Sequence, residues 1–203
     1  MKRLLIARHG NTFGPGDIPT RVGARTDLPL VDSGLEQARR LGRYLKEHDL
    51  IPDAVYTSEL QRTRQMAEIA LQEVGLEIAT QANPIFNEID YGPDENQTED
   101  KVIARLGEQA LSDWDNSAVV PDGWQVDPHR IISDWQHFAQ GIDDNKTFIV
   151  ITSNGIARFA PYLTGEFDAF LQNYKIKIST GALCILEKDQ GANWAVKGWN
   201  IKP

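Results

Sequence analysis

The sequence has a single cysteine and no long apolar run, and each shortage excludes a class of protein. Cys184 has no partner for an internal disulfide, and its place in the apolar segment GALCILE predicts a buried core thiol. No run approaches the ~20 apolar residues of a membrane-spanning helix. The opening MKRLLIARHG has four apolar residues before an arginine, too few for the core of a signal peptide. We therefore expect a cytoplasmic protein that does not cross a membrane.

Positive charge is also scarce. The 203 residues include 21 lysines and arginines against 29 acidic residues, a formal net charge of −8. Nucleic acids and anionic membranes require a basic face, so neither is expected as a partner, while the oligomeric state stays open. A small anionic substrate is compatible with this charge, because it needs only a few local arginines. With 41% hydrophobic residues the chain can bury one substantial core, which predicts one domain over residues 1–203.

Short apolar runs alternate with amphipathic segments along the chain. Five runs are typical of strands: 3–8, 53–58, 147–153, and the late hairpin 180–188 with 194–200. The amphipathic segments 34–48 and 59–74 lie between the first three runs and carry apolar side chains at helical spacing. This order predicts an α/β fold whose central sheet is mostly parallel and is flanked by helices on both faces.

Several residues mark where the helices should begin. Ser33 with Glu36 and Ser58 with Gln61 have the spacing of capping boxes, in which a hydroxyl caps the first turn and the residue three positions later reaches back. Asp127 before Pro128 predicts the start of a further helix, because aspartate caps well and proline suits the first helical position. Residues 141–146, GIDDNK, are typical of a solvated turn.

Polar residues follow three of the predicted strands. Arg8, His9 and Gly10 follow the first strand, residues 58–62 follow the second and residues 153–155 follow the third. In parallel sheets, ligands bind beyond the carboxyl ends of the strands, so these segments should converge on one pocket.

Arg62 is out of place electrostatically, because it falls in the first turn of a predicted helix. The positive end of the helix dipole disfavours a cation there and favours an anion. An anion such as phosphate would resolve the conflict, since the guanidinium and the free backbone N–H groups can both bind it. The alternative is a surface ion pair with Glu59 or a nearby aspartate.

Four segments in a fixed order resemble one known family. They are RHGNT (8–12), RTDLPLVDSGLEQA (25–38), VYTSELQRTRQMAE (55–68) and NEIDYG (87–92). Together they resemble the histidine phosphatase superfamily, whose members have the phosphoglycerate mutase-like fold. The resemblance covers residues 3–92 and resumes at 147–158. Nothing specific to the family is present in residues 93–146.

The resemblance implies that His9 is a nucleophile that attacks phosphorus and carries the phosphoryl group. A neutral imidazole suits this role, because one ring nitrogen has a free lone pair while the other donates to an acceptor that orients the ring. Arg8 and Arg62 would clamp the phosphoryl oxygens, and Asn11 and Thr12 would add neutral donors, with no metal or other cofactor. Without the other motifs, a lone histidine here would be a satisfied core residue.

The family pattern places the general acid at Glu88, with Asp90 as the competing candidate. A carboxyl group donates a proton near neutral pH only if burial or a neighbouring charge raises its pKa. Without the other motifs, both would be interpreted as solvated turn residues.

One segment departs from the family pattern. The family usually has a second histidine in an SHGG-like segment after the late strand, and this chain has ITSNGIAR. Aligning Gly155 with the glycine that opens the next helix puts Ser153 in the place of the histidine and Asn154 after it. Both can bind phosphate oxygens, but neither carries charge, so binding should survive better than turnover. His129 and His137 are alternative substitutes, or ordinary residues of the helix after Pro128; their spacing fits no metal site.

Three functions are compatible with these residues. The first is a metal-independent phosphomonoester hydrolase that acts through phosphohistidine on a small phosphorylated metabolite. The second is a mutase of the phosphoglycerate mutase type, for which residues 93–146 offer no sign of the usual longer insertions. The third is a degenerate member that binds phosphorylated ligands with little catalysis. Specificity would come from residues 13–22 and 93–130, which do not identify a substrate.

Overall fold

A six-stranded sheet forms the centre of the computed structural model, which describes all residues, 1–203. The strand order is β3-β2-β4-β1-β5-β6. Strands β1 to β4 pair in parallel and the last two are antiparallel, which confirms the mostly parallel sheet and the late hairpin. The bounds are β1 Lys2–Arg8, β2 Ala54–Thr57, β3 Thr80–Ala82, β4 Thr147–Thr152, β5 Leu183–Lys188 and β6 Ala195–Ile201.

Strand β1 shows why the sheet is covered on both faces. Successive side chains of a strand point to opposite sides. Leu4 and Ile6 accordingly join the larger buried cluster, and Leu5 and Ala7 join the smaller one. A strand buried on both faces therefore has a continuous apolar sequence rather than an alternating one. Cys184 is fully buried in the larger cluster, as predicted.

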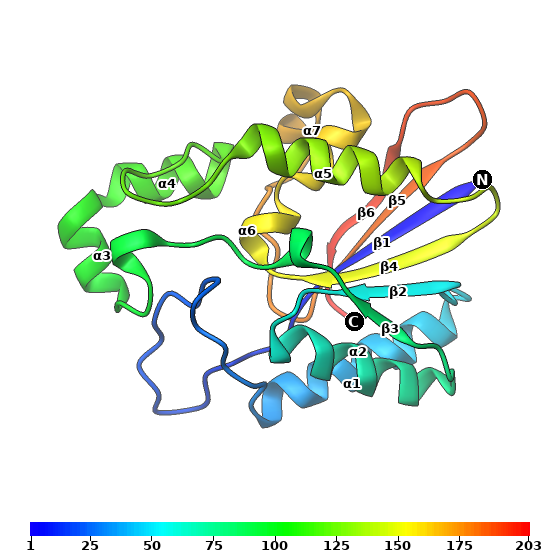
Figure 1. Ribbon diagram of the computed structural model, residues 1–203, viewed down its shortest axis with the longest axis horizontal. Helices are drawn as coiled ribbons and strands as arrows, with labels where there is room; N and C mark the ends of the chain where they lie inside the picture. Colours follow the sequence, from blue (N-terminus) through cyan, green and yellow to red (C-terminus); the bar gives the residue numbers. More distant parts are fainter.

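The helices form two layers. α1 (Asp32–Glu47) and α2 (Gln61–Val74) cover one face, and α5 (Pro128–Gln140), α6 (Asn154–Ala157) and α7 (Phe167–Asn173) lie on the other (Figure 1). α3 (Glu99–Leu106) and α4 (Glu108–Ser117) lie beyond the end of the sheet at which β1 ends (Figure 1). Short 3-10 turns complete the chain at η1 (Pro84–Phe86), η2 (Gly92–Asp94) and η3 (Ala160–Thr164). None of the helices combines the length and apolarity that a membrane crossing requires.

Neither predicted capping box forms, whereas the predicted start of a helix at Pro128 is confirmed. α5 begins at Pro128 with the Asp127 side chain accepting from a backbone N–H, as predicted. α1 begins at Asp32 without a side-chain cap, so Ser33 lies inside the helix, where its hydroxyl accepts a hydrogen bond from the Asn11 side chain. α2 begins after Leu60, and the Ser58 hydroxyl accepts from the N–H of Leu60 outside the helix.

Candidate active site

The carboxyl ends of β1, β2 and β4 lie at one level of the sheet. Arg8 pairs with Thr152, and Thr57 pairs with Ile151. The residues that follow these strands therefore meet at the same edge. They open into a cavity of about 560 Å³, whose lining includes Arg8, His9, Glu88 and Asn154.

The His9 ring is held by hydrogen bonds at both nitrogens. Nδ1 lies 2.8 Å from the carbonyl oxygen of Gly10, which makes Nδ1 the protonated nitrogen. Nε2 therefore carries the lone pair, and it accepts from Nε of Arg62 at 3.2 Å. Burial and the charges of Arg62 and Arg8 hold the pKa of His9 well below 6.5. The imidazole is neutral at physiological pH, with its basic nitrogen facing a guanidinium.

Arg62 lies in the first turn of α2, as predicted, and is fully buried. Besides the His9 contact, its terminal nitrogens donate to the carbonyl oxygens of Thr26 at 2.8 Å and Gly23 at 3.3 Å. None of these partners is a carboxylate. The surface ion pair with Glu59 is thus wrong, because Glu59 lies outside and accepts from Asn87 instead. Arg62 is a buried cation held in place by neutral groups.

Arg8 gives the cavity a second cation, whose side chain is half-buried. Its Nη1 donates to the carbonyl oxygen of Ile178 at 2.6 Å, and its Nε is buried without a hydrogen-bond partner. Burial lowers the pKa of Arg8, and the nearby Glu88 opposes that shift. A guanidinium with an unused buried donor at a cavity wall is suited to bind an anion.

Glu88 and Asp90 differ in the way that proton donation requires. Glu88 is 6% exposed and accepts from the N–H groups of Ile89 at 2.9 Å and Gly155 at 3.3 Å. Burial raises the pKa of Glu88. At Asp90, burial is outweighed by the ion pair with Arg25, which lowers its pKa. Glu88 is the carboxyl group that can hold a proton closer to neutral pH, and it faces the cavity.

The remaining predicted donors divide into those that reach the cavity and one that does not. Asn11, Thr12 and Asn154 line it. Ser153 is fully buried, its hydroxyl has no hydrogen-bond partner, and it is not part of the lining. Asn154 is therefore the member of the Ser-Asn pair that faces the cavity, and contact between Ser153 and phosphate stays a prediction.

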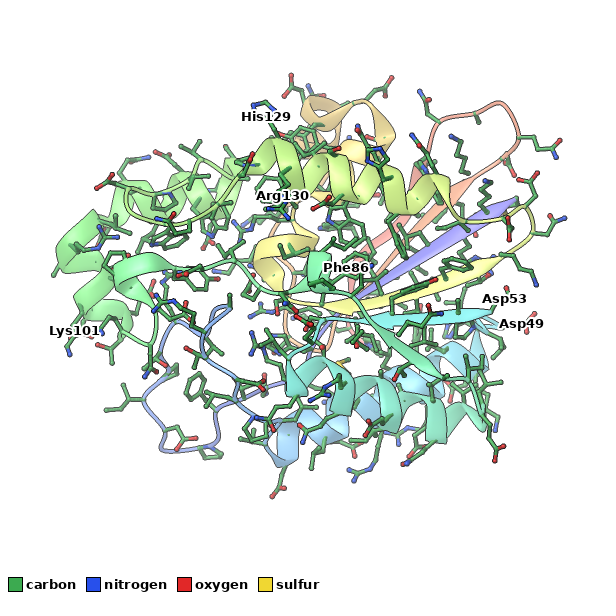
Figure 2. The ribbon with its side chains drawn as sticks, in the orientation of Figure 1. Asp49, Asp53, Phe86, Lys101, His129 and Arg130 are labelled. Atoms are coloured by element: carbon green, nitrogen blue, oxygen red, sulfur yellow. The ribbon has the colours of Figure 1, made fainter.

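The alternative histidines are remote from this cavity. His129 lies at the start of α5 and projects from the outer surface of the molecule (Figure 2). His137 is exposed further along the same helix, where its Nδ1 donates to the carbonyl oxygen of Ser133 at 2.9 Å. Neither lines the cavity, so the proposal that they replace the missing histidine is wrong. No group of three or more His, Cys, Asp or Glu side chains is arranged to hold a metal ion.

Sequence reasoning missed several cavity residues. Arg158 follows Asn154 by one helical turn, and this i to i+4 spacing was the signal that could have found it. Tyr91 lies in the recognised motif NEIDYG. Lys177 comes from a distant segment, and nothing in the local pattern indicates its place. The missed lining residues are Tyr91, Arg158, Lys177 and Thr180, whereas Arg21, Glu99, Trp114 and Asp115 lie in residues 13–22 and 93–130, the segments expected to set specificity.

The arrangement of the cavity residues and a comparison with known proteins together identify the family of this chain. The fold and the cavity define an α/β protein with a buried histidine at the carboxyl edge of a parallel sheet; Arg8 lines the cavity beside it, and Arg62 contacts the histidine from behind the lining. The family model of the histidine phosphatase superfamily (branch 1) matches residues 4–202. The chain belongs to this superfamily.

Two phosphoglycerate mutases illustrate the similarity in sequence. A 2,3-bisphosphoglycerate-dependent phosphoglycerate mutase of Bradyrhizobium sp. is 32% identical over 58% of this chain and 56% of its own length. The matches to such curated mutases span little more than half of their length. Phosphoglycerate mutase 1 of Saccharomyces cerevisiae is 25% identical over 100% of this chain and 94% of its own.

Solved structures share the fold. A mycobacterial glucosyl-3-phosphoglycerate phosphatase superposes with a TM-score of 0.79 at 16% identity, covering 99% of both chains. The α-ribazole phosphatase of Shigella flexneri has a TM-score of 0.72 at 20% identity, covering 98% of this chain and 96% of its own. At these identities the likeness establishes the phosphoglycerate mutase-like fold alone.

Proposed function

We propose that this protein is a phosphomonoester hydrolase that transfers the phosphoryl group of a small metabolite to His9 and then to water. The observation that carries the proposal is the state of the His9 ring. Its Nδ1 proton is committed to Gly10, and its basic Nε2 faces a buried guanidinium at the edge of a cavity. A neutral, oriented imidazole beside unneutralised cations is suited to attack a phosphoryl group.

The substrate's phosphoryl oxygens would lie between Arg8 and Arg62. Phosphoryl transfer depends mainly on positioning and on positive charge at the non-bridging oxygens. The unused Nε of Arg8 and the Nε of Arg62 supply donors for these oxygens. When Arg62 turns its donor from His9 to the phosphoryl group, the Nε2 lone pair is released for attack.

The first step forms a bond between Nε2 of His9 and phosphorus, and the bond from phosphorus to the ester oxygen breaks. Glu88 gives its proton to the departing oxygen, so the alcohol leaves neutral. In the second step a water molecule gives a proton back to Glu88 and attacks phosphorus, and the nitrogen–phosphorus bond breaks. Inorganic phosphate leaves, and both His9 and Glu88 return to their initial states.

A panel of phosphomonoesters, assayed with a chelator present, tests the proposal. We expect release of inorganic phosphate by the wild-type protein and none by His9→Ala. Phosphate release that requires an added metal ion, or that persists in His9→Ala, would contradict the mechanism.

A mutase is the second candidate, because several curated relatives are named phosphoglycerate mutases. A mutase would return the phosphoryl group from His9 to another hydroxyl instead of to water. Analysis of the products separates the two, since a mutase forms an isomeric phosphoester and a hydrolase forms inorganic phosphate. Binding of phosphoesters without either product would identify a degenerate binder, which the uncharged Asn154 favours.

A further inference from the structure

One wall of the cavity contains charged residues that the proposed chemistry does not use. This wall, the Arg158 wall, consists of Trp114, Asp115, Arg158 and Lys177. It combines the end of α4, the residue after α6 and the segment before β5. None of these residues forms a hydrogen bond with the His9 side chain.

Arg158 is a buried cation that has no carboxylate oxygen within hydrogen-bond distance. Its side chain is 1% exposed, its Nη1 donates to the carbonyl oxygen of Trp114 at 2.5 Å and its Nε donates to that of Asn154 at 3.3 Å. The guanidinium lies 3.9 Å from the ring centre of Trp114. The nearest carboxylate oxygen, on Asp115, is 3.8 Å from Nη2, beyond hydrogen-bond distance. Burying such a charge is unfavourable unless a partner satisfies it.

Asp115 does not neutralise this wall, because it is shared. Its other oxygen accepts from Nζ of Lys177 at 2.6 Å, and Lys177 is more than half exposed. Two cations thus face one carboxylate, which leaves a surplus of one positive charge on a cavity wall. Burial lowers the pKa of Arg158 to about 10, so the guanidinium stays charged at neutral pH.

The Arg158 wall is connected to the residues of the phosphoryl site. The backbone of Ile178, next to Lys177, accepts from Arg8 at 2.6 Å and donates to the Asn154 side chain at 2.9 Å. Asn154 in turn supplies the carbonyl oxygen that holds Arg158. A ligand that reaches from Arg8 along this wall would meet the surplus charge.

We propose that the Arg158 wall binds a carboxylate on the substrate, at a site separate from the group that is transferred. The proposal rests on the proposed function, because it assigns a substrate class to the same cavity. A carboxylate carries the single negative charge that the surplus requires, whereas a second phosphate would bring up to two. Its planar pair of oxygens also matches the unused N–H groups of a guanidinium.

Two variants change the surplus in opposite directions. Lys177→Ala leaves Asp115 to neutralise Arg158 alone, so the surplus disappears. Asp115→Asn keeps both cations and removes the carboxylate, so the surplus rises. Lys101→Ala is the matched control, because Lys101 is an exposed lysine of α3 that points away from the molecule (Figure 2).

The test compares 3-phosphoglycerate with glycerol 3-phosphate. The first has a carboxylate where the second has a hydroxymethyl group. We expect wild type to have the higher kcat/KM for 3-phosphoglycerate. Lys177→Ala should reduce that preference by about tenfold, the effect of losing one hydrogen bond to a charged group. Asp115→Asn should increase it, and Lys101→Ala should leave it within twofold. A wild-type preference for glycerol 3-phosphate, or equal loss for both esters in Lys177→Ala, would overturn the proposal.

A binding measurement separates this proposal from the hydrolase proposal. Calorimetry on His9→Ala, alone and combined with Lys177→Ala, gives the affinities of both esters without turnover. Tighter binding of 3-phosphoglycerate that depends on Lys177 supports the carboxylate site even if wild type hydrolyses neither ester. Equal affinity for the two esters, including no measurable binding of either, overturns it.

Discussion

Replacing Gly155 with alanine should disable Glu88 while leaving the fold intact. A Cβ atom at this position would lie 2.2 Å from Oε1 of Glu88 and 2.8 Å from Cγ1 of Ile89. Contacts this short cannot persist, so the Glu88 carboxyl group must move. The backbone of Gly155 is helical and alanine has the higher helix propensity, so the substitution itself does not oppose α6. The effect is therefore a steric one, directed at the proton donor.

The expected loss depends on the leaving group. General acid catalysis contributes about 100- to 10,000-fold, so we expect kcat/KM of Gly155→Ala for an alkyl ester such as glycerol 3-phosphate to fall by about 100-fold. For 4-nitrophenyl phosphate, whose leaving group needs little protonation, the loss should stay under about tenfold. The ratio kcat/KM reports the steps up to phosphoryl transfer, so slow hydrolysis of phosphohistidine does not hide the difference.

The pH dependence of activity tests the role of Glu88 independently. Glu88 must be protonated, and burial raises its pKa, so wild-type activity persists to higher pH than an ordinary carboxyl group would allow. A carboxyl group displaced toward solvent regains a lower pKa, and the alkaline limb of Gly155→Ala should move to lower pH. Gly141→Ala is the control, since a Cβ there meets nothing closer than 3.4 Å. Equal losses for alkyl and aryl esters, with an unmoved alkaline limb, would refute the reasoning.

Three further predictions follow from the contacts around the cavity. Arg62→Ala should weaken binding of inorganic phosphate, measured by calorimetry, and lower kcat by about 100- to 1,000-fold. The reason is that a buried hydrogen-bond donor is lost both from the phosphate-bound ground state and from the transition state. Glu95 accepts from the N–H groups of Gly23 and Arg25 and from the Thr26 hydroxyl, so it holds the loop whose carbonyl oxygens fix Arg62. Glu95→Ala should lower kcat/KM in wild type and have much less effect when Arg62 is already alanine; additive effects would exclude this role. Asp94 accepts from Arg105 and from the Trp124 indole, and these partners outweigh burial and lower its pKa. Asp94→Asn should reduce the free energy of urea unfolding by about 2 kcal/mol at pH 7, and the difference should shrink as the pH falls through the folded-state pKa of Asp94, because the ionised form is the stabilising one.

The sheet and the polar end of its strands could be predicted because local pattern determines them. Strand β1 is apolar on both faces, and its last residue is the arginine that lines the cavity. The position of Arg62 in a first turn also follows from local sequence. Strand β3 could not be predicted, since the polar segment TQA pairs at the edge of the sheet without an apolar run.

The features that the sequence does not reveal depend on contacts between distant segments and on burial. Ser33 has the sequence context of a helix cap, but its hydroxyl accepts a hydrogen bond from the side chain of Asn11, which is 22 positions away in the chain. Asp115 and Lys177 form an ion pair across 62 positions, which no local spacing indicates. Ser153 and Asn154 are neighbours in sequence, and only their burial shows which one reaches the cavity. Site residues that are recruited by tertiary packing thus require the structure.

Trapping of phosphohistidine at His9 tests the central claim most directly. The protein would be mixed with a phosphorus-labelled phosphomonoester, quenched within milliseconds in base and digested, and the label located by mass spectrometry. The account predicts base-stable, acid-labile phosphate on Nε2 of His9, because Nδ1 is committed to Gly10, and no label in His9→Ala. Phosphate on another residue, or rapid turnover by His9→Ala, would contradict it.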